Sequence, residues 1–438
     1  MWSLQSLNNF FTRRNFDFDD PSIDLYKFHP QLKFFLAING IFFNNTDSKL
    51  RFIWPFIYNS LTIMALTFEI IFMKHGIAIK DYAFATESLC YFIIISSIPI
   101  VNISVLLNKS KVMKLLECLD RDFIYVRTME PRYKSLFLQG QLLIWQLCYA
   151  WFIFTTSVAS LFVVTCLLAL MYQSLFVTQD EHTVRPLPFP MWLPNDDPYR
   201  TPNYEIFLIL EIIVCFNFIQ TFCVYVYIMF HTLLHYYYVM DMIFLDFEVI
   251  FNDLDETVVK LSRYHPRRVA VQMELNRRMK RIVNWHLSVF RSVELISSVY
   301  GPPLVFQVSV SSIAICLMAY QIADYLEQGK IHFLFILLCL AASIQLWIPC
   351  FLGTLIRNQA FAVGEACWRC GWQETPLGQL LRSDFIILIV RAQQPVTIKF
   401  TGLPKLELET FSSVSHYNVI HRLRRRNTII WKETLSKT

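Results

Sequence analysis

Charged residues and glycines are both scarce in this chain. Only 17% of its 438 residues are Asp, Glu, Lys or Arg, and only 10 are glycine, whereas an ordinary soluble domain is about 25% charged. The shortage of glycine argues against phosphate-binding loops, and neither GxGxxG nor GxxxxGK is present. The chain has instead 55% hydrophobic residues, including 39 Phe and 20 Tyr. This balance predicts an all-α, polytopic membrane helix bundle in a lipid bilayer.

The motifs of common enzymes and metal sites are also missing. The sequence has neither GxSxG nor HExxH, and Cys367 and Cys370 form a single CxxC without the second pair of a structural zinc site. His231 and His235 share a helix face but have no third ligand at a suitable spacing. The formal charge of +5 reflects the excess of Lys and Arg usual in cytoplasmic loops. We therefore expect no enzyme, no metal or other cofactor and no nucleic-acid partner.

Apolar segments of membrane-spanning length occur six times. A transmembrane helix needs about 20 mostly apolar residues. The segments that meet this requirement cover residues 52–73, 84–107, 142–172, 206–230, 301–323 and 332–356. A seventh span is incomplete, because the apolar run 385–390 is too short and the stretch 403–421 carries several charged residues.

The distribution of Lys and Arg predicts the orientation. The region 1–51 has six of them, and the six following connections have two, seven, two, nine, one and three in turn. Basic residues concentrate in cytoplasmic connections, so the N-terminus and the even-numbered connections are expected inside. A G-protein-coupled receptor has its N-terminus outside, which argues against that class. Clusters of basic residues normally stay on the cytoplasmic side of the membrane, so the basic tail 415–438 also argues against a regular seventh crossing.

These features divide the chain into four parts. We expect a cytoplasmic region 1–51, a bundle 52–356, a connection with the start of the seventh span in 357–414, and an atypical basic tail in 415–438. Inside the bundle, the long connection 231–300 has an acidic helical arm followed by a basic arm, with a break at His265 and Pro266. This pattern predicts a helical hairpin below the membrane.

The outer halves of the spans contain candidates for a ligand site. The third connection, rich in proline from Arg185 to Pro194, is a candidate cap for a ligand entrance. A small apolar ligand is held mainly by apolar burial, with one or two polar groups that fix its orientation. Glu211 is a candidate polar group, and its alternative role is hydrogen bonding inside the bundle. The full set of candidate ligand contacts is Tyr91, Phe92, Phe162, Glu211, Ile212, Phe216, Ile315, Met318 and Phe335.

The second half of the chain resembles the insect odorant receptor family. The similar pieces are Trp285-His286 with Cys316, then Cys350-Phe-Leu-Gly353, Trp368-x-Cys370-x-Trp372, and the more specific Arg391-Ala-Gln-Gln-Pro395. Trp368 stands where the family has a Tyr. The resemblance covers about residues 280–414 by motif and the whole chain by topology. The proline-rich third connection also resembles receptors of moths in the pheromone branch.

The resemblance implies a ligand-gated cation channel in the plasma membrane of olfactory neurons. The implied complex is a hetero-oligomer, a tetramer with a shared coreceptor subunit, and its ligand is a small volatile odorant or a pheromone. The resemblance also implies that cytoplasmic extensions of the later spans form a helical anchor region, which agrees with the predicted hairpin. The last helix of this family lines the pore, but the apolar residues expected after about Ser413-Val414 are absent here. A gustatory receptor channel is the nearest alternative. A membrane transporter is an alternative from a different class, and it predicts paired broken helices or inverted repeats.

Overall fold

Helices form all the regular structure that this computed structural model describes. It describes residues 4–13, 17–18, 20, 24–41, 46, 48–176, 184–194, 196–394, 396–398, 407–409 and 412. Within these ranges no strand occurs, so the predicted all-α class is confirmed. The helices are α1 (Leu4–Thr12), α2 (Leu25–Phe28), α3 (Pro30–Ile38), η1 (Lys49–Phe52), α4 (Ile53–Ala78), α5 (Tyr82–Leu107), α6 (Lys109–Arg127), α7 (Pro131–Phe176), α8 (Asn203–Glu248), η2 (Glu256–Lys260), α9 (Pro266–Glu327), α10 (Phe333–Arg369), η3 (Pro376–Leu381) and α11 (Arg382–Ala392).

The six predicted spans are confirmed. Within the part of the chain that the structure describes, six helical stretches are long and apolar enough to cross a membrane: η1 with α4, α5, α7, α8, the part Pro303–Glu327 of α9, and α10. Several helices continue well past the predicted limits, so α7 begins at Pro131 and α8 ends at Glu248. The tail 415–438, and all of the stretch 403–421 except 407–409 and 412, lie outside the described residues, whereas the apolar run 385–390 lies in α11.

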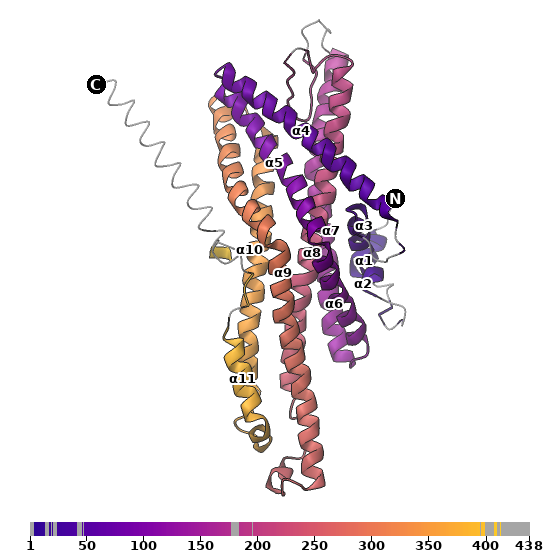
Figure 1. The fold of residues 1–438 in the computed structure, drawn as a ribbon, viewed down its shortest axis with the longest axis vertical. Helices are drawn as coiled ribbons and strands as arrows, with labels where there is room; N and C mark the ends of the chain where they lie inside the picture. The colour runs from indigo at the N-terminus through magenta and orange to yellow at the C-terminus, as the bar shows by residue number, and fades with distance from the viewer. Residues whose placement is uncertain are drawn as a thin grey trace, which may run out of the picture.

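The long helices form an elongated bundle (Figure 1). At one end lie the turn between α4 and α5, the turn between α9 and α10, and the loop 184–202 between α7 and α8; we call this the pocket end. The opposite end carries α11 and the turn 249–265 between α8 and α9, and we call it the hairpin end. The short helices α1 and α3 pack on α7 and α8 at the side of the bundle.

Capping residues mark where two of the long helices begin. The Asp81 side chain accepts a hydrogen bond from the backbone N–H of Phe84, 3.0 Å away, at the start of α5. His265 caps α9 in the same way, with Pro266 in the first helical turn. Side-chain acceptors at this position satisfy N–H groups that have no partner inside the helix. The sequence break at His265-Pro266 therefore begins the second arm of the predicted hairpin.

Helix α8 is the central element of the bundle. It contacts α3, α4, α5, α6, α7, α9 and α10. Its most apolar stretch is 56% buried, against 28–44% for the other five spans. The part of α8 near the pocket end, which includes Val214 and Phe222, packs in one apolar core, and the rest, which includes Met242 and Ile243, packs in a second core that extends to the hairpin end. One continuous helix therefore links the two ends of the molecule.

Candidate functional site

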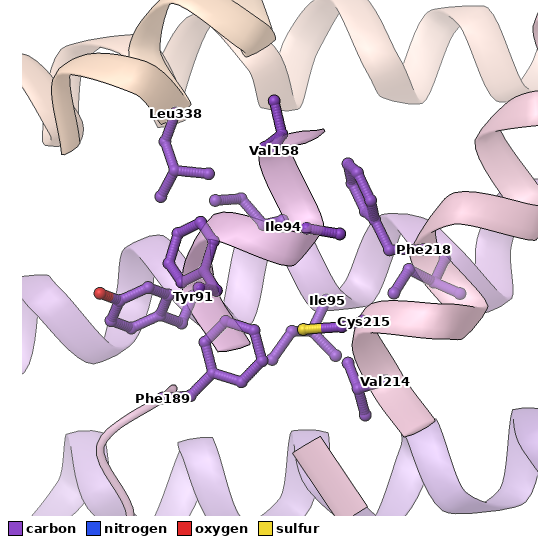
Figure 2. Close-up of a pocket in the computed structure, with 12 residues that line it drawn as sticks. Tyr91, Ile94, Ile95, Val158, Phe189, Val214, Cys215, Phe218 and Leu338 are labelled. Carbon is purple, nitrogen blue, oxygen red and sulfur yellow. The ribbon is translucent and has the colours of Figure 1, made fainter. Parts of the chain in front are cut away.

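A small apolar cavity of about 40 Å³ lies at the pocket end. Its walls come from α5, α7, α8 and α10, and one residue of the loop 184–202 completes it. This volume is well below the roughly 300–1,000 Å³ usual for small-molecule sites, so an odorant-sized ligand must displace some of the lining side chains. The lining residues are Tyr91, Ile94, Ile95, Ile98, Val158, Ala159, Phe162, Phe189, Val214, Cys215, Phe218 and Leu338. Figure 2 shows nine of them labelled around the cavity.

Hydrogen-bonding groups are few in this lining. Among the twelve side chains only Tyr91 has an oxygen and only Cys215 has a sulfur. The hydroxyl oxygen of Tyr91 points away from the other lining side chains (Figure 2). A thiol in apolar surroundings behaves as a small hydrophobe. The pocket is therefore suited to a ligand that is held by apolar contact.

Three aromatic rings meet at one side of the cavity. The centroid of the Phe189 ring lies 5.3 Å from that of Tyr91 and 5.7 Å from that of Phe162. Phe335 packs behind Tyr91 at 5.8 Å, outside the lining. Aromatic rings whose centroids lie about 4.5–7 Å apart stabilise each other by more than the burial of their surface area alone provides. Phe189 thus joins the loop to two helices by ring packing.

The loop that carries Phe189 is fastened to the helices at several points. The carbonyl oxygen of Pro186 accepts hydrogen bonds from the Tyr204 hydroxyl at 2.9 Å and the Cys166 thiol at 3.1 Å. Trp192 stacks on His75 of α4, with ring centroids 3.9 Å apart and planes inclined by 10°. The described part of the proline-rich loop, 184–194, therefore packs over the pocket end, and its role as a cap for a ligand entrance stays a prediction.

Glu211 holds the centre of this loop. Its Oε2 accepts a hydrogen bond from the backbone N–H of Phe189 at 3.0 Å, and both residues are buried. A second buried carboxyl group at this end, Glu69, accepts a hydrogen bond from the Ser88 hydroxyl at 2.8 Å. Buried polar groups are normally paired in this way. Glu211 thus contacts the loop backbone, while its neighbours one turn further along α8 line the pocket.

The nine predicted contact residues separate into three groups. Tyr91 and Phe162 line the pocket, and Glu211 supports it from behind. Met318 and Phe335 are buried in the same apolar cluster, and Ile315 packs at its margin. Phe92 is partly exposed. Ile212 and Phe216 are 39% and 47% exposed and face outward. These last two lie on a different face of α8 from residues 211, 214, 215 and 218, which recur at helical spacing on the pocket side.

The remaining lining residues were not predicted, although a signal for several of them exists in the sequence. Once Tyr91 is chosen on α5, the helical spacing i+3, i+4 and i+7 points to Ile94, Ile95 and Ile98, which all line the cavity. Phe189 has no comparable signal, because it lies in a loop whose path cannot be read from periodicity.

Asn217 and Gln220, which follow Glu211 on α8, belong to a separate buried network. The Asn217 amide donates to the Thr62 hydroxyl at 3.1 Å, and the Gln220 amide oxygen accepts from the Trp54 indole N–H at 3.4 Å. These bonds connect α8 with α4 below the pocket. In a membrane, polar side chains of this kind hold helices together.

The two histidines of α8, His231 and His235, contact side chains from other parts of the chain inside the bundle. His235 contacts Asp122 and Gln141 at 3.4 Å, while the ring of His231 packs edge-on against His29, with centroids 4.4 Å apart. Burial, and then the proximity of His231, lowers the pKa of His29 well below its usual value. Within the described residues no group of three or more His, Cys, Asp or Glu side chains is arranged to hold a metal ion.

Comparison with known proteins identifies a family and several relatives that this chain resembles. The family model described as 7tm Odorant receptor matches residues 81–417. Odorant receptor 13a of Drosophila melanogaster is 26% identical over 159 residues, which cover 33% of this chain and 36% of the relative. The odorant receptor coreceptor of Anopheles gambiae is 28% identical over 146 residues, 33% of this chain and 30% of the relative. The matched segment thus spans about a third of the length of these relatives.

The solved structures give a longer match. The insect olfactory receptor OR5 from Machilis hrabei superposes with a TM-score of 0.65 at 17% identity, covering 91% of this chain and 97% of the receptor. The same receptor in complex with eugenol gives a TM-score of 0.67 at 16% identity, covering 92% and 98%. The helical architecture is therefore shared over almost the whole of both chains.

Proposed function

Because the chain belongs to the 7tm odorant receptor family, a family of receptors and not of enzymes, we propose that its pocket binds a small, predominantly apolar odorant. The observation that carries this proposal is the lining, in which no oxygen or nitrogen atom of a side chain faces the cavity. Binding then rests on apolar burial, worth about 25 cal/mol per Å². The complex of OR5 with eugenol, a small aromatic odorant, supports a ligand of this class.

We further propose that odorant binding opens a cation channel shared with a coreceptor subunit in the plasma membrane of olfactory neurons. The chain's relatives include an odorant receptor coreceptor. Apolar side chains are also exposed on α10 and α11 near the hairpin end, namely Phe361, Trp368, Ile386, Ile387 and Val390. Exposed apolar surface beyond the pocket is typical of a face that meets another subunit, which supports a hetero-oligomer.

The test is a current recording with a pocket-filling variant. The chain is expressed with a coreceptor in cells that lack both, and eugenol and a series of 2-alkanones are applied. Ala159 lines the pocket between Val158 and Phe162. We expect Ala159→Phe to lower the response at least tenfold, because the added ring occupies the cavity. Val164→Phe on the lipid-facing side of the same helix, where Val164 is exposed, is the matched control and should keep the response.

Two outcomes contradict the proposal. If Ala159→Phe responds as the unchanged protein does while both reach the cell surface, the ligand binds elsewhere. If no member of a broad panel of apolar volatiles evokes a current or displaces an apolar fluorescent probe from the purified full chain, odorant binding itself is refuted. Uptake of labelled ligand against a gradient, in place of a current, indicates the alternative class of a transporter.

A further inference from the structure

Resting on the proposed function, we infer that Phe189 limits the length of the ligand and that Glu211 is the positioning residue that holds Phe189 in place. Phe189 is the one residue among the twelve that line the pocket which comes from the loop and not from a helix. It is only 8% exposed, and its ring closes the cavity against Tyr91 and Phe162.

The sequence around Phe189 explains why one hydrogen bond matters here. Phe189 stands between Pro188 and Pro190, and proline has no backbone N–H. The N–H of Phe189 is therefore the only backbone donor in this tripeptide. Its acceptor is Glu211 Oε2 at 3.0 Å, and because both groups are buried, loss of the acceptor leaves a donor without a partner in an apolar environment.

The other contacts of the loop do not replace this bond. Tyr204 and Cys166 hold Pro186, three residues before Phe189, and His75 holds Trp192, three residues after it. The flanks are thus fixed independently of Glu211. Removal of the carboxyl group is expected to release the segment around Phe189 while the rest of the loop remains attached.

This arrangement makes Glu211 important for ligand selection without contact with the ligand. With the Phe189 ring in place, the pocket is closed on the side of the loop. When the ring is absent or displaced, an alkyl chain can extend past Tyr91 and Phe162 toward the loop. Each additional CH₂ group that becomes buried raises affinity roughly fourfold. The variants should therefore change the longest ligand accepted more than the affinity for short ligands.

The experiment measures displacement of N-phenyl-1-naphthylamine from the purified full chain by 2-alkanones of increasing length. In the unchanged protein, affinity should rise with length to a cut-off and then fall. Phe189→Ala and Glu211→Leu should each move the cut-off to longer chains and strengthen binding of the first excluded ketone about tenfold or more. Glu211→Gln should retain the original cut-off, because its amide oxygen still accepts the N–H of Phe189.

The combined variant separates a positioning role from a general structural one. If Glu211 acts through Phe189, then Glu211→Leu added to Phe189→Ala changes the cut-off no further. Tyr204→Phe, which removes a loop contact at Pro186 and not at Phe189, should leave the cut-off where it was. The series also distinguishes a short odorant from a long-chain pheromone as the natural class of ligand.

Distinct results would overturn the inference. If Glu211→Leu weakens the binding of all ketones equally, the residue supports the bundle as a whole. If Glu211→Gln does not retain the original cut-off, the carboxyl group acts on the ligand directly. An unchanged cut-off in Phe189→Ala, which does not depend on how Glu211→Leu folds, also refutes it. In these cases the proposed function survives, whereas an unchanged protein that binds neither the probe nor any ketone refutes both.

Discussion

At the scale of single residues, Gly140 determines how closely α7 approaches α8. A Cβ atom built at Gly140 lies 2.4 Å from the ring of Tyr238, far inside normal contact distance. We expect Gly140→Ala to lower stability by about 1–3 kcal/mol, because the helices must move apart or the ring must turn. The measurement is the melting temperature of the protein in detergent.

The control for Gly140 is a compensating change. Tyr238→Leu shortens the side chain that the new methyl group meets, so the double variant Gly140→Ala with Tyr238→Leu should recover part of the loss. Additive destabilisation in the double variant would show that the contact with Tyr238 is not the cause.

His286 gives a prediction for pH. Burial, with a smaller contribution from the nearby charge of Arg391, lowers the pKa of His286 from 6.5 to about 4. The folded protein therefore binds fewer protons than the unfolded chain between these values. The contribution of neutral His286 to the free energy of unfolding is fully present above pH 6.5 and declines as the pH falls toward 4. The loss amounts to about 2 kcal/mol at pH 5.

The measurement is the melting temperature between pH 8 and pH 5, compared with His286→Gln, which cannot titrate. We expect the variant to lose less stability on acidification, although other buried histidines such as His29 contribute in both proteins. Parallel curves for the two proteins would contradict a buried neutral His286.

Residues 212 and 214 show what sequence could not decide at this scale. Ile212 faces outward and Val214 lines the pocket, yet both are branched apolar residues on one helix. In a soluble protein, exposing Ile212 to water would cost free energy, so the outer face of the helix would be polar and its inner face apolar. Lipid tails are as apolar as a protein interior, so composition does not distinguish the pocket face of α8 from its lipid face.

At the scale of elements, one ion pair joins three helices at the hairpin end. Asp246 of α8 is 2% exposed and accepts a hydrogen bond from the Tyr133 hydroxyl of α7 at 2.6 Å and one from Arg281 Nε of α9 at 3.1 Å. We expect Arg281→Leu to cost about 3–5 kcal/mol, because it leaves a buried carboxylate without its counter-ion. The measurement is chemical or thermal unfolding of the full chain in detergent.

The paired variant tests the cause. Arg281→Leu combined with Asp246→Leu removes both charges and should be markedly more stable than Arg281→Leu alone. If the double variant is instead the less stable one, the pair contributes through packing and not through charge.

The elements themselves were largely predictable, and their lengths were not. The apolar runs located the six spans, because a bilayer requires about 20 apolar residues in each. The apolar runs predict no helix in the connection after α5, yet α6 (Lys109–Arg127) fills most of it, with Leu115, Leu116 and Leu119 buried. Its helix is amphipathic and short of the membrane length, so a search for apolar runs passes over it.

At the scale of the whole molecule, the positive charges predict which end lies inside. The hairpin end carries the densest Lys and Arg, on α6 and around the start of α9. We expect epitopes at the N-terminus and in the turn 262–264 to be labelled only after cells are permeabilised. An epitope in the turn 328–330 at the pocket end should be labelled on intact cells. The reverse pattern would invert the topology and place the pocket toward the cytoplasm.

The length of α8 has a mechanical consequence. Its 46 residues run unbroken from the pocket to the hairpin and, at 1.5 Å per residue, span about 70 Å. Val214 lies about 36 Å from Tyr238, where α7 crosses closely against Gly140. If that crossing serves as a fulcrum, a tilt of about 5° displaces the pocket segment by roughly 3 Å, the length of two helical residues. A ligand that separates the side chains beside Val214 by a few ångströms would then move the hairpin end of α8 in the opposite direction.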